Sequence, residues 1–173
     1  MSTPIILLVS WFAFTNEASA QSVDSLIIEL SKKWENAKAY TLKMAEAMPA
    51  ENYNFKPTPD VMSFKQQLLH IAENMKWLSS AHLFSPSSKA EKDTASWDKA
   101  AVVKYVTAAY EQGLAAHHLL RQNQLNEVVP FFAGTMSRRK ILVLMHDHQT
   151  HHVGQLILYL RLKGIKPPAY VGW

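Results

Sequence analysis

Histidine is the residue type in this sequence that most plainly could do chemistry. The chain has 173 residues and eight histidines, and four of these fall between positions 146 and 152. Imidazole is the commonest protein ligand for metal ions and titrates near neutral pH. The chain has no cysteine. A thiolate nucleophile, a disulfide and a cysteine-type zinc site are therefore excluded.

Two of the four clustered histidines share one face of a predicted helix. An α-helix turns about 100° per residue, so His148 and His152 both lie within about 40° of Ile141. The rest of that face is largely apolar, which predicts that it faces the core. Its other members are Met145, Gln155 and Tyr159.

The other two clustered histidines lie elsewhere on the helix. His146 is about 140° away from Ile141, so we expect it to point outward. His151 is intermediate and lies one turn after Asp147, which favours a surface Asp–His pair.

Histidines one turn apart on one face, such as His148 and His152, can reach one metal ion. The HExxH helix of metalloproteases uses this spacing, but no Glu follows His148 here, so the protease class is excluded. A single core-facing histidine is usually just hydrogen-bonded. Two stacked imidazoles need polar partners when they are buried. Spacing alone leaves a metal ion and a hydrogen-bonded pair equally open.

A third ligand would have to come from another helix. Periodicity does not select it, because several histidines remain as candidates. His70 lies on the flank of its helix's apolar stripe, with Gln67, Asn74 and Trp77. The other candidates are His82, His117 and His118.

The elements that must position these side chains are helices. Glycine is rare, with 5 in the chain, and strand-like alternation is hard to find, so long helices with short connections are favoured. Apolar residues at helical spacing predict four helices, over about residues 22–48, 63–84, 97–124 and 137–163. We therefore predict an all-α fold, an up-down four-helix bundle.

Local signals set the ends of these helices. Two prolines in the segment 51–59 predict a loop, and residues 85–96 form a polar linker. Gly164 is a good residue to end the last helix, with Pro167 and Pro168 behind it. The candidate N-caps are Ser22 or Asp24, then Asp60 or Ser63, and Ser137 or Thr135.

Composition predicts one globular domain. Apolar residues make up 48% of the chain and the net charge is +4, with the basic residues scattered among acidic ones. Nucleic-acid binding would need a clustered basic face. The only dense basic run is Arg138–Lys140, which is more typical of a solvated turn. We therefore expect no nucleic-acid partner.

The first twenty residues read as a secretory signal peptide. Residues 5–14 are apolar or small, and Ala18-Ser19-Ala20 forms a cleavage pattern before Gln21. The run is too short to span a bilayer, so no stable membrane anchor is expected. This divides the chain into a signal, 1–20, and a helical domain, 21–173. It predicts a secreted or periplasmic protein. If the segment is instead a buried N-terminal helix, the protein is cytoplasmic.

Two stretches of the sequence resemble the DinB-like superfamily. The run from His148 to Leu156, followed by Tyr159-Leu160-Arg161 and Gly164, is similar to that family's C-terminal signature. The segments 53–59 and 68–72 are similar to its first loop and second helix. The resemblance covers essentially residues 22–173.

The resemblance implies a four-helix bundle with a metal ion bound by three histidines. Carried over, these are His70 from the second helix and His148 and His152 from the fourth. It also implies zinc or nickel as the metal, and a homodimer. Some family members are thiol-dependent transferases or isomerases that use mycothiol or bacillithiol, and many have no assigned reaction.

Three neutral imidazoles leave metal positions open, which is the catalytic rather than the structural pattern. We therefore expect a metal-dependent hydrolase or transferase that activates water or a thiol for an unknown small-molecule substrate. Export would weigh against the thiol version, because thiol cofactors are mainly cytoplasmic. The alternatives are a non-catalytic metal-binding or stress-related bundle and a helical adaptor without metal.

Two further residues are candidates for supporting roles. Glu73 lies three positions after His70 and could act as a base or an acceptor, or it could be a surface carboxylate. Gln155 lies about one helical turn after His152. It could orient the His152 imidazole, or it could pack in the seam between two helices.

Overall fold

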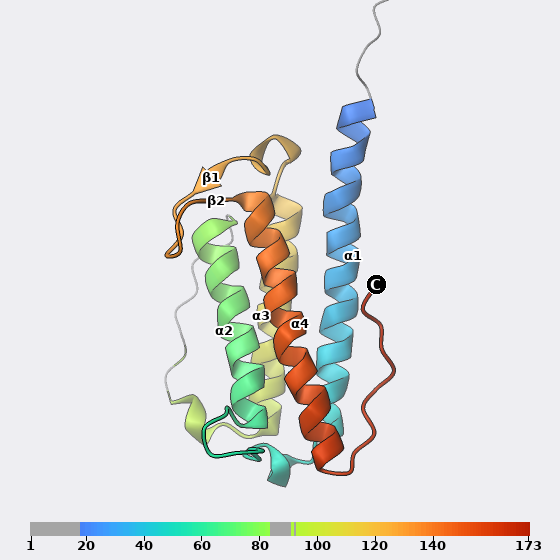
Figure 1. Cartoon of the computed structure of the whole chain (residues 1–173), viewed down its shortest axis with the longest axis vertical. Helices are drawn as coiled ribbons and strands as arrows, with labels where there is room; N and C mark the ends of the chain where they lie inside the picture. The colour runs from blue at the N-terminus through green and yellow to red at the C-terminus, as the bar shows by residue number, and fades with distance from the viewer. Residues whose placement is uncertain (1–17, 84–90, 92) are drawn as a thin grey trace, which may run out of the picture.

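The computed structural model describes residues 18–83, 91 and 93–173 and contains four long helices (Figure 1). They are α1 (Ala18–Ala47), α2 (Phe64–His82), α3 (Lys99–Leu119) and α4 (Arg138–Leu162). The prediction of a mostly helical protein with four helices is confirmed. Within the described residues, no helix is long and apolar enough to cross a bilayer. The signal peptide predicted for residues 1–20 lies mostly outside the described part, so the division at position 20 stays a prediction.

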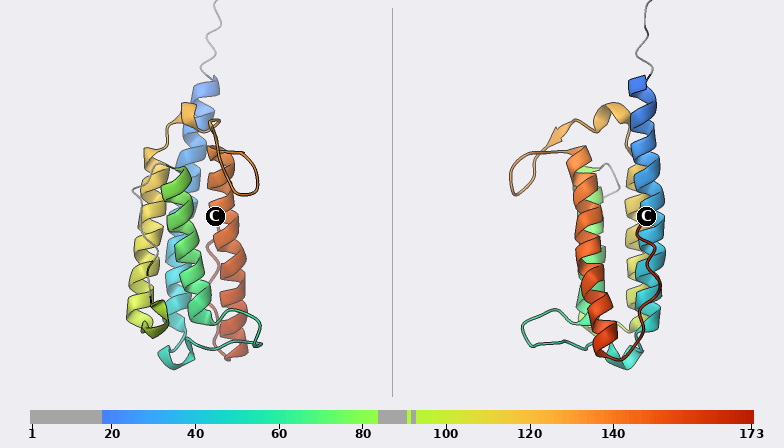
Figure 2. Two further views of the ribbon diagram at one scale, coloured as in Figure 1. Left: turned by 90° about the vertical axis from the view of Figure 1, so that its left-hand side faces the viewer. Right: turned by 45° about the vertical axis from the view of Figure 1, so that its right-hand side comes forward.

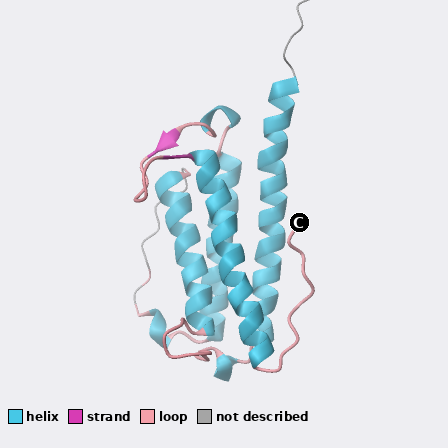
Figure 3. Ribbon diagram, viewed as in Figure 1, coloured by secondary structure: helices cyan, strands magenta, loops and turns pink. Residues whose placement is uncertain are grey.

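Short elements connect the long helices. The described residues include three 3₁₀ turns, η1 (Ala50–Asn52), η2 (Thr94–Ser96) and η3 (Gln122–Gln124). A small antiparallel ribbon precedes α4, with β1 (Val128–Val129) paired to β2 (Met136–Ser137) (Figure 3). The sequence did not predict this ribbon, because two-residue strands are too short to show alternation.

The order of helix directions differs from the up-down prediction. Lys65, near the start of α2, donates hydrogen bonds to the carbonyl oxygens of Ala95 and Trp97, just before α3 begins. Further along both helices, Gln112 of α3 donates to the hydroxyl of Ser79 in α2. Both helices therefore start at the same end of the bundle and run parallel (Figure 1).

The expected up-down order is thus wrong: the bundle is up-down-down-up. The segment from Leu83 to Asp98 has nearly as many residues as α2. An extended chain covers about 3.3 Å per residue and a helix only about 1.5 Å, so this segment is long enough to return to the other end of the bundle. An up-down order would need a short connection at this point.

The helix ends agree with most of the local signals. Ser63 caps α2 in a reciprocal capping box with Gln66, and Gly164 follows α4 with a positive φ of 72°. Two predicted ends are wrong. The helix α1 begins at Ala18, before both of its candidate caps. The helix α3 ends at Leu119 rather than at position 124, because the chain turns there and forms η3.

The start of α4 offers a stability test between two candidate caps. The Ser137 hydroxyl accepts a hydrogen bond from the backbone N–H of Lys140, whereas Thr135 is exposed and lies before β2. We expect Ser137→Ala to lower the free energy of unfolding by about 1 kcal/mol. Thr135→Ala should leave it within about 0.5 kcal/mol of the wild type. Urea unfolding of the two variants measures both values. Equal losses would contradict the assignment of the cap.

The core is centred on the large side chains of all four helices. Trp34 of α1 is completely buried and donates a hydrogen bond from Nε1 to the carbonyl oxygen of Tyr110, 2.9 Å away. Gly113 of α3 faces the same indole, and a Cβ atom there would lie 2.6 Å from its Cζ2 atom. Glycine at this position lets α1 and α3 pack closely.

Candidate metal centre

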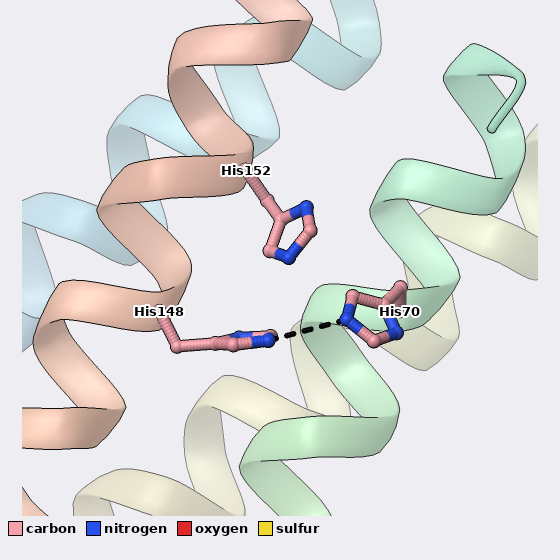
Figure 4. Close-up of side chains that lie close together, drawn as sticks. All are labelled: His70, His148 and His152. Atoms are coloured by element: carbon pink, nitrogen blue, oxygen red, sulfur yellow. Dashed lines mark hydrogen bonds between the residues drawn. The ribbon is translucent and has the colours of Figure 1, made fainter. Parts of the chain in front are cut away.

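Three histidines from two helices converge on one point of the α2–α4 face (Figure 4). They are His70 of α2 and His148 and His152 of α4, and their ligand nitrogens all lie within 4.8 Å of one another. The Nε2 atoms of His70 and His148 are 3.2 Å apart. An imidazole nitrogen binds zinc at about 2.0–2.1 Å, so nitrogens this close can share one ion.

The antiparallel packing of α2 against α4 produces this convergence. His148 and His152 lie one turn apart on α4, and the His152 and His70 ring centroids are 4.5 Å apart. Among the candidates that periodicity left open, His70 is thus the one that the structure groups with His148 and His152. His118 is exposed at the end of α3, and His82 contacts the rings of Trp77 and Phe131.

The surroundings favour the neutral form of the two α4 ligands. Partial burial lowers the pKa of His148 to about 4, and the nearby His70 and His151 act in the same direction. Partial burial also lowers the pKa of His152 to about 4, with His148 and His70 as further causes. Neutral imidazoles keep the lone pair that a metal ion requires. Both side chains are half-buried rather than fully in the core.

A glutamine fixes which nitrogen of His152 is free. Gln67 is buried, and its Oε1 atom lies 2.6 Å from Nδ1 of His152. Its Nε2 atom donates to the Tyr159 hydroxyl at 3.5 Å, and that hydroxyl donates to the Met62 carbonyl oxygen at 2.8 Å. The amide oxygen can only accept, so Nδ1 of His152 carries the proton and Nε2 is left for a metal.

This role of Gln67 was not predicted from the sequence. The available signal was its position three residues before His70, on the same flank of the helix. The orienting role was instead predicted for Gln155. Within the described part of the chain, the hydrogen bond of His152 goes to Gln67, so the role assigned to Gln155 is not supported.

Replacing Gln67 tests this hydrogen bond directly. We expect Gln67→Ala to weaken metal affinity by about 10- to 100-fold, because the His152 ring loses its fixed orientation. Competition with a chelating dye measures the affinity. Gln155→Ala is the matched control, because it removes the other glutamine that was predicted to orient His152. This variant should bind metal as the wild type does. A larger loss from the Gln155 variant would show that the assignment is wrong.

Glu73 does not lie towards the three histidines. It is exposed, and its charge contributes to raising the pKa of Tyr105 on α3 to about 12, after the larger effect of burial. Glu73 therefore lies on the α3 side of α2. The metal-ligand groups found among the described residues consist of the three histidines alone, without a carboxylate. The weak prediction of Glu73 as a base gains no support.

The predicted outward orientation of His146 is wrong. This residue is only 3% exposed. Its ring packs edge-on against Trp34 at 5.0 Å, and its Nε2 atom lies 3.4 Å from Nε2 of His117. The helix α4 packs on both α2 and α1, so its buried arc is wider than the stripe counted from Ile141. Burial lowers the pKa of His146 to about 3.

His151 and Asp147 are both exposed, as expected for surface residues. The ring of His151 lies beside that of His152, with centroids 4.9 Å apart, but His151 is not one of the three converging histidines. The four clustered histidines therefore divide into two candidate ligands, one core residue and one surface residue.

Comparisons with known proteins agree with this architecture. A sequence profile of the DinB family matches residues 7–172. The uncharacterized protein YjoA of Bacillus subtilis strain 168 is 28% identical over 136 residues, which are 72% of this chain and 82% of YjoA.

Solved structures of similar proteins share the fold. The crystal structure of the DinB-like YjoA from Bacillus subtilis superposes with a TM-score of 0.69 at 21% identity and covers 82% of this chain and 96% of that one. A DinB-like protein from Bacillus cereus ATCC 10987 gives 0.66 at 16% identity, covering 82% and 95%. A conserved protein from Enterococcus faecalis gives 0.62 at 17%, covering 77% and 94%.

Proposed function

The chain belongs to the DinB family, and from this premise we propose that it is a metal-dependent hydrolase or transferase. The observation that carries the proposal is the convergence of His70, His148 and His152, with ligand nitrogens within 4.8 Å of one another. Three half-buried imidazole ligands leave room for a further small ligand, as in catalytic sites.

The residues of the chain would hold and orient the ion. His70 would contact it from α2, and His148 and His152 would contact it from α4. The hydrogen bond to Gln67 keeps the His152 Nε2 atom available. A divalent ion in this site would act as a Lewis acid that lowers the pKa of a bound water or thiol.

The nucleophile would come from outside the chain, because the protein has no cysteine and the site has no described carboxylate. With water as the nucleophile the protein would be a hydrolase, and with a small thiol as the nucleophile it would be a transferase. We propose zinc or nickel as the ion, since both accept imidazole ligands. We also propose a homodimer that is secreted or periplasmic if residues 1–20 are a cleaved signal.

Metal removal tests this proposal through stability and turnover together. An ion present at 100 to 1,000 times its dissociation constant stabilises the folded state by about 2.7–4.1 kcal/mol. We therefore expect a chelator to lower the melting temperature by about 5–15 °C. Re-addition of zinc or nickel should restore it and should also restore turnover on a panel of esters and thiol acceptors.

The outcomes of this experiment separate the alternatives. A large loss of melting temperature without any turnover would favour a non-catalytic metal-binding or stress-related bundle. Substoichiometric metal in the native protein and no response to the chelator would favour a helical adaptor and would contradict the proposal.

A further inference from the structure

A cluster of aromatic rings lies exposed at one end of the α2–α4 face. Trp77 of α2 is 41% exposed and Phe132, in the loop between β1 and β2, is 84% exposed. The ring of Phe131 lies between them, with centroids 5.6 Å from Trp77 and 4.5 Å from Phe132. We call these three residues the aromatic patch. Single exposed apolar residues are ordinary on a protein surface, but three rings in mutual contact mark a binding surface.

The aromatic patch lies on the same side of α2 as the metal ligand. Trp77 follows His70 by two helical turns, so the two side chains point in nearly the same direction and are separated by about 10 Å along the helix. The charged residues between them along α2, Glu73 and Lys76, are on the α3 side of the helix, where both charges act on Tyr105, and the positions on the α4 side are uncharged. Asn74 lies one turn after His70 on α2, and Leu144 lies one turn before His148 on α4, and both are half-buried. An apolar chain could therefore run from the metal centre to the patch along the seam between α2 and α4, past Asn74 and Leu144.

Two loops project beyond this face at its two ends. The loop between β1 and β2 carries Phe131 and Phe132 at one end, and the loop 53–63 lies at the other (Figure 2). Both lie on the side of α2 and α4 rather than on the side of α1 (Figure 2). The metal ligands lie between these loops along the bundle, so a ligand bound to the ion would be flanked by the aromatic patch.

We propose that the aromatic patch of Trp77, Phe131 and Phe132 binds the apolar tail of a small-molecule substrate whose head group reaches the ion held by His70, His148 and His152. This rests on the proposed function, because the patch gains its role from the ion beside it. The substrate class is an ester, amide or thiol compound with an aryl or long alkyl group about 10 Å from the reacting head. The patch determines specificity, and the histidines carry the chemistry.

Hydroxamic acids test this proposal because their head group binds zinc directly. Binding of acetohydroxamic, benzohydroxamic and 6-phenylhexanohydroxamic acid to the zinc-loaded protein would be measured by calorimetry. The long probe can place its ring at the patch, and the benzoic probe cannot. Burying one aromatic ring against others should make the long probe bind about tenfold more tightly than the other two.

Variants of the patch show whether its rings cause this difference. Phe132→Ala and Trp77→Ala should remove most of the tenfold advantage and leave acetohydroxamic acid binding unchanged. Phe132 is mostly exposed, so its loss should not impair folding. Val128→Ala is the control, because Val128 is an exposed residue of β1 outside the patch. It should bind all three probes as the wild type does.

The possible failures point to different errors. If acetohydroxamic acid does not bind the zinc-loaded protein, the open metal centre is wrong and the specificity proposal falls with it. If it binds but the long probe has no advantage, or keeps its advantage in both patch variants, the proposed function stands and the role of the patch is overturned. A patch that instead joins two copies would give no advantage to the long probe, and Phe132→Ala would convert a dimer to a monomer.

Discussion

Replacement of His148 by alanine is expected to remove the metal ion from the protein. The His148 Nε2 atom lies 3.2 Å from its counterpart on His70, so this side chain joins the α4 and α2 parts of the site. Zinc sites with four ligands bind with about 10–16 kcal/mol, or about 3 kcal/mol per ligand. Loss of one ligand should therefore weaken affinity by at least about 100-fold.

Elemental analysis of the native protein beside the variant measures this effect. We expect about one ion per chain in the native protein and less than about a tenth of an ion in His148→Ala. His118→Ala is the control, because His118 is an exposed histidine on α3, remote from the three ligands. It should keep its full metal content. A His148 variant that retains its metal would show that the ion is held elsewhere.

The sequence and the family resemblance predicted the grouping of the three histidines better than the sequence predicted the order of helix directions. Helical spacing placed His148 and His152 on one face, because the angle between them depends only on the local backbone. The choice of His70 came from the family resemblance, since no local pattern encodes which helix packs against α4. The structure confirms this grouping. The hydrogen bond from His152 to Gln67 was missed for the same reason, because it joins residues on two helices.

The helix order could not be predicted from local signals. Apolar stripes and caps predicted four helices. Ser63 and Ser137 cap the starts of α2 and α4, and Gly164 follows the end of α4, each as one of the expected candidates. Whether α3 runs parallel or antiparallel to α2 depends on the end of the bundle at which α3 begins, after the segment 83–98. The contact of Lys65 with Trp97 decides it, and such a long-range hydrogen bond leaves no periodic trace in the sequence.

His146 is buried, although the sequence predicted that it points outward, and its burial leads to a prediction with a large effect. Its imidazole is buried against Trp34, and among the described residues its Nδ1 atom has no hydrogen-bond partner. Burial lowers its pKa from 6.5 to about 3. Between these two values the unfolded chain binds a proton at His146 that the folded protein does not bind. Stability should therefore fall as the pH falls from about 6.5 towards 3.

The loss attributable to His146 should reach about 2 kcal/mol between pH 7 and pH 5, where most carboxylates stay ionised. Urea unfolding of metal-free protein at both pH values measures it. His146→Gln removes the titrating group but keeps a polar side chain near His117, so it should lose about 2 kcal/mol less than the wild type over this range. His118→Gln, at an exposed position, should follow the wild type.

Comparing the pH dependence rather than the absolute stability makes this test independent of the cost of the substitution itself. His148 and His152 also have lowered pKa values, but they are present in both proteins and cancel in the difference. If His146→Gln loses as much stability on acidification as the wild type, the imidazole of His146 is accessible to protons in the folded state. That result would support the outward orientation that the sequence alone had predicted. The expected result would instead make His146 a buried acid-sensitive position in the α1–α3–α4 core, separate from the candidate metal centre to which His148, two residues away, belongs.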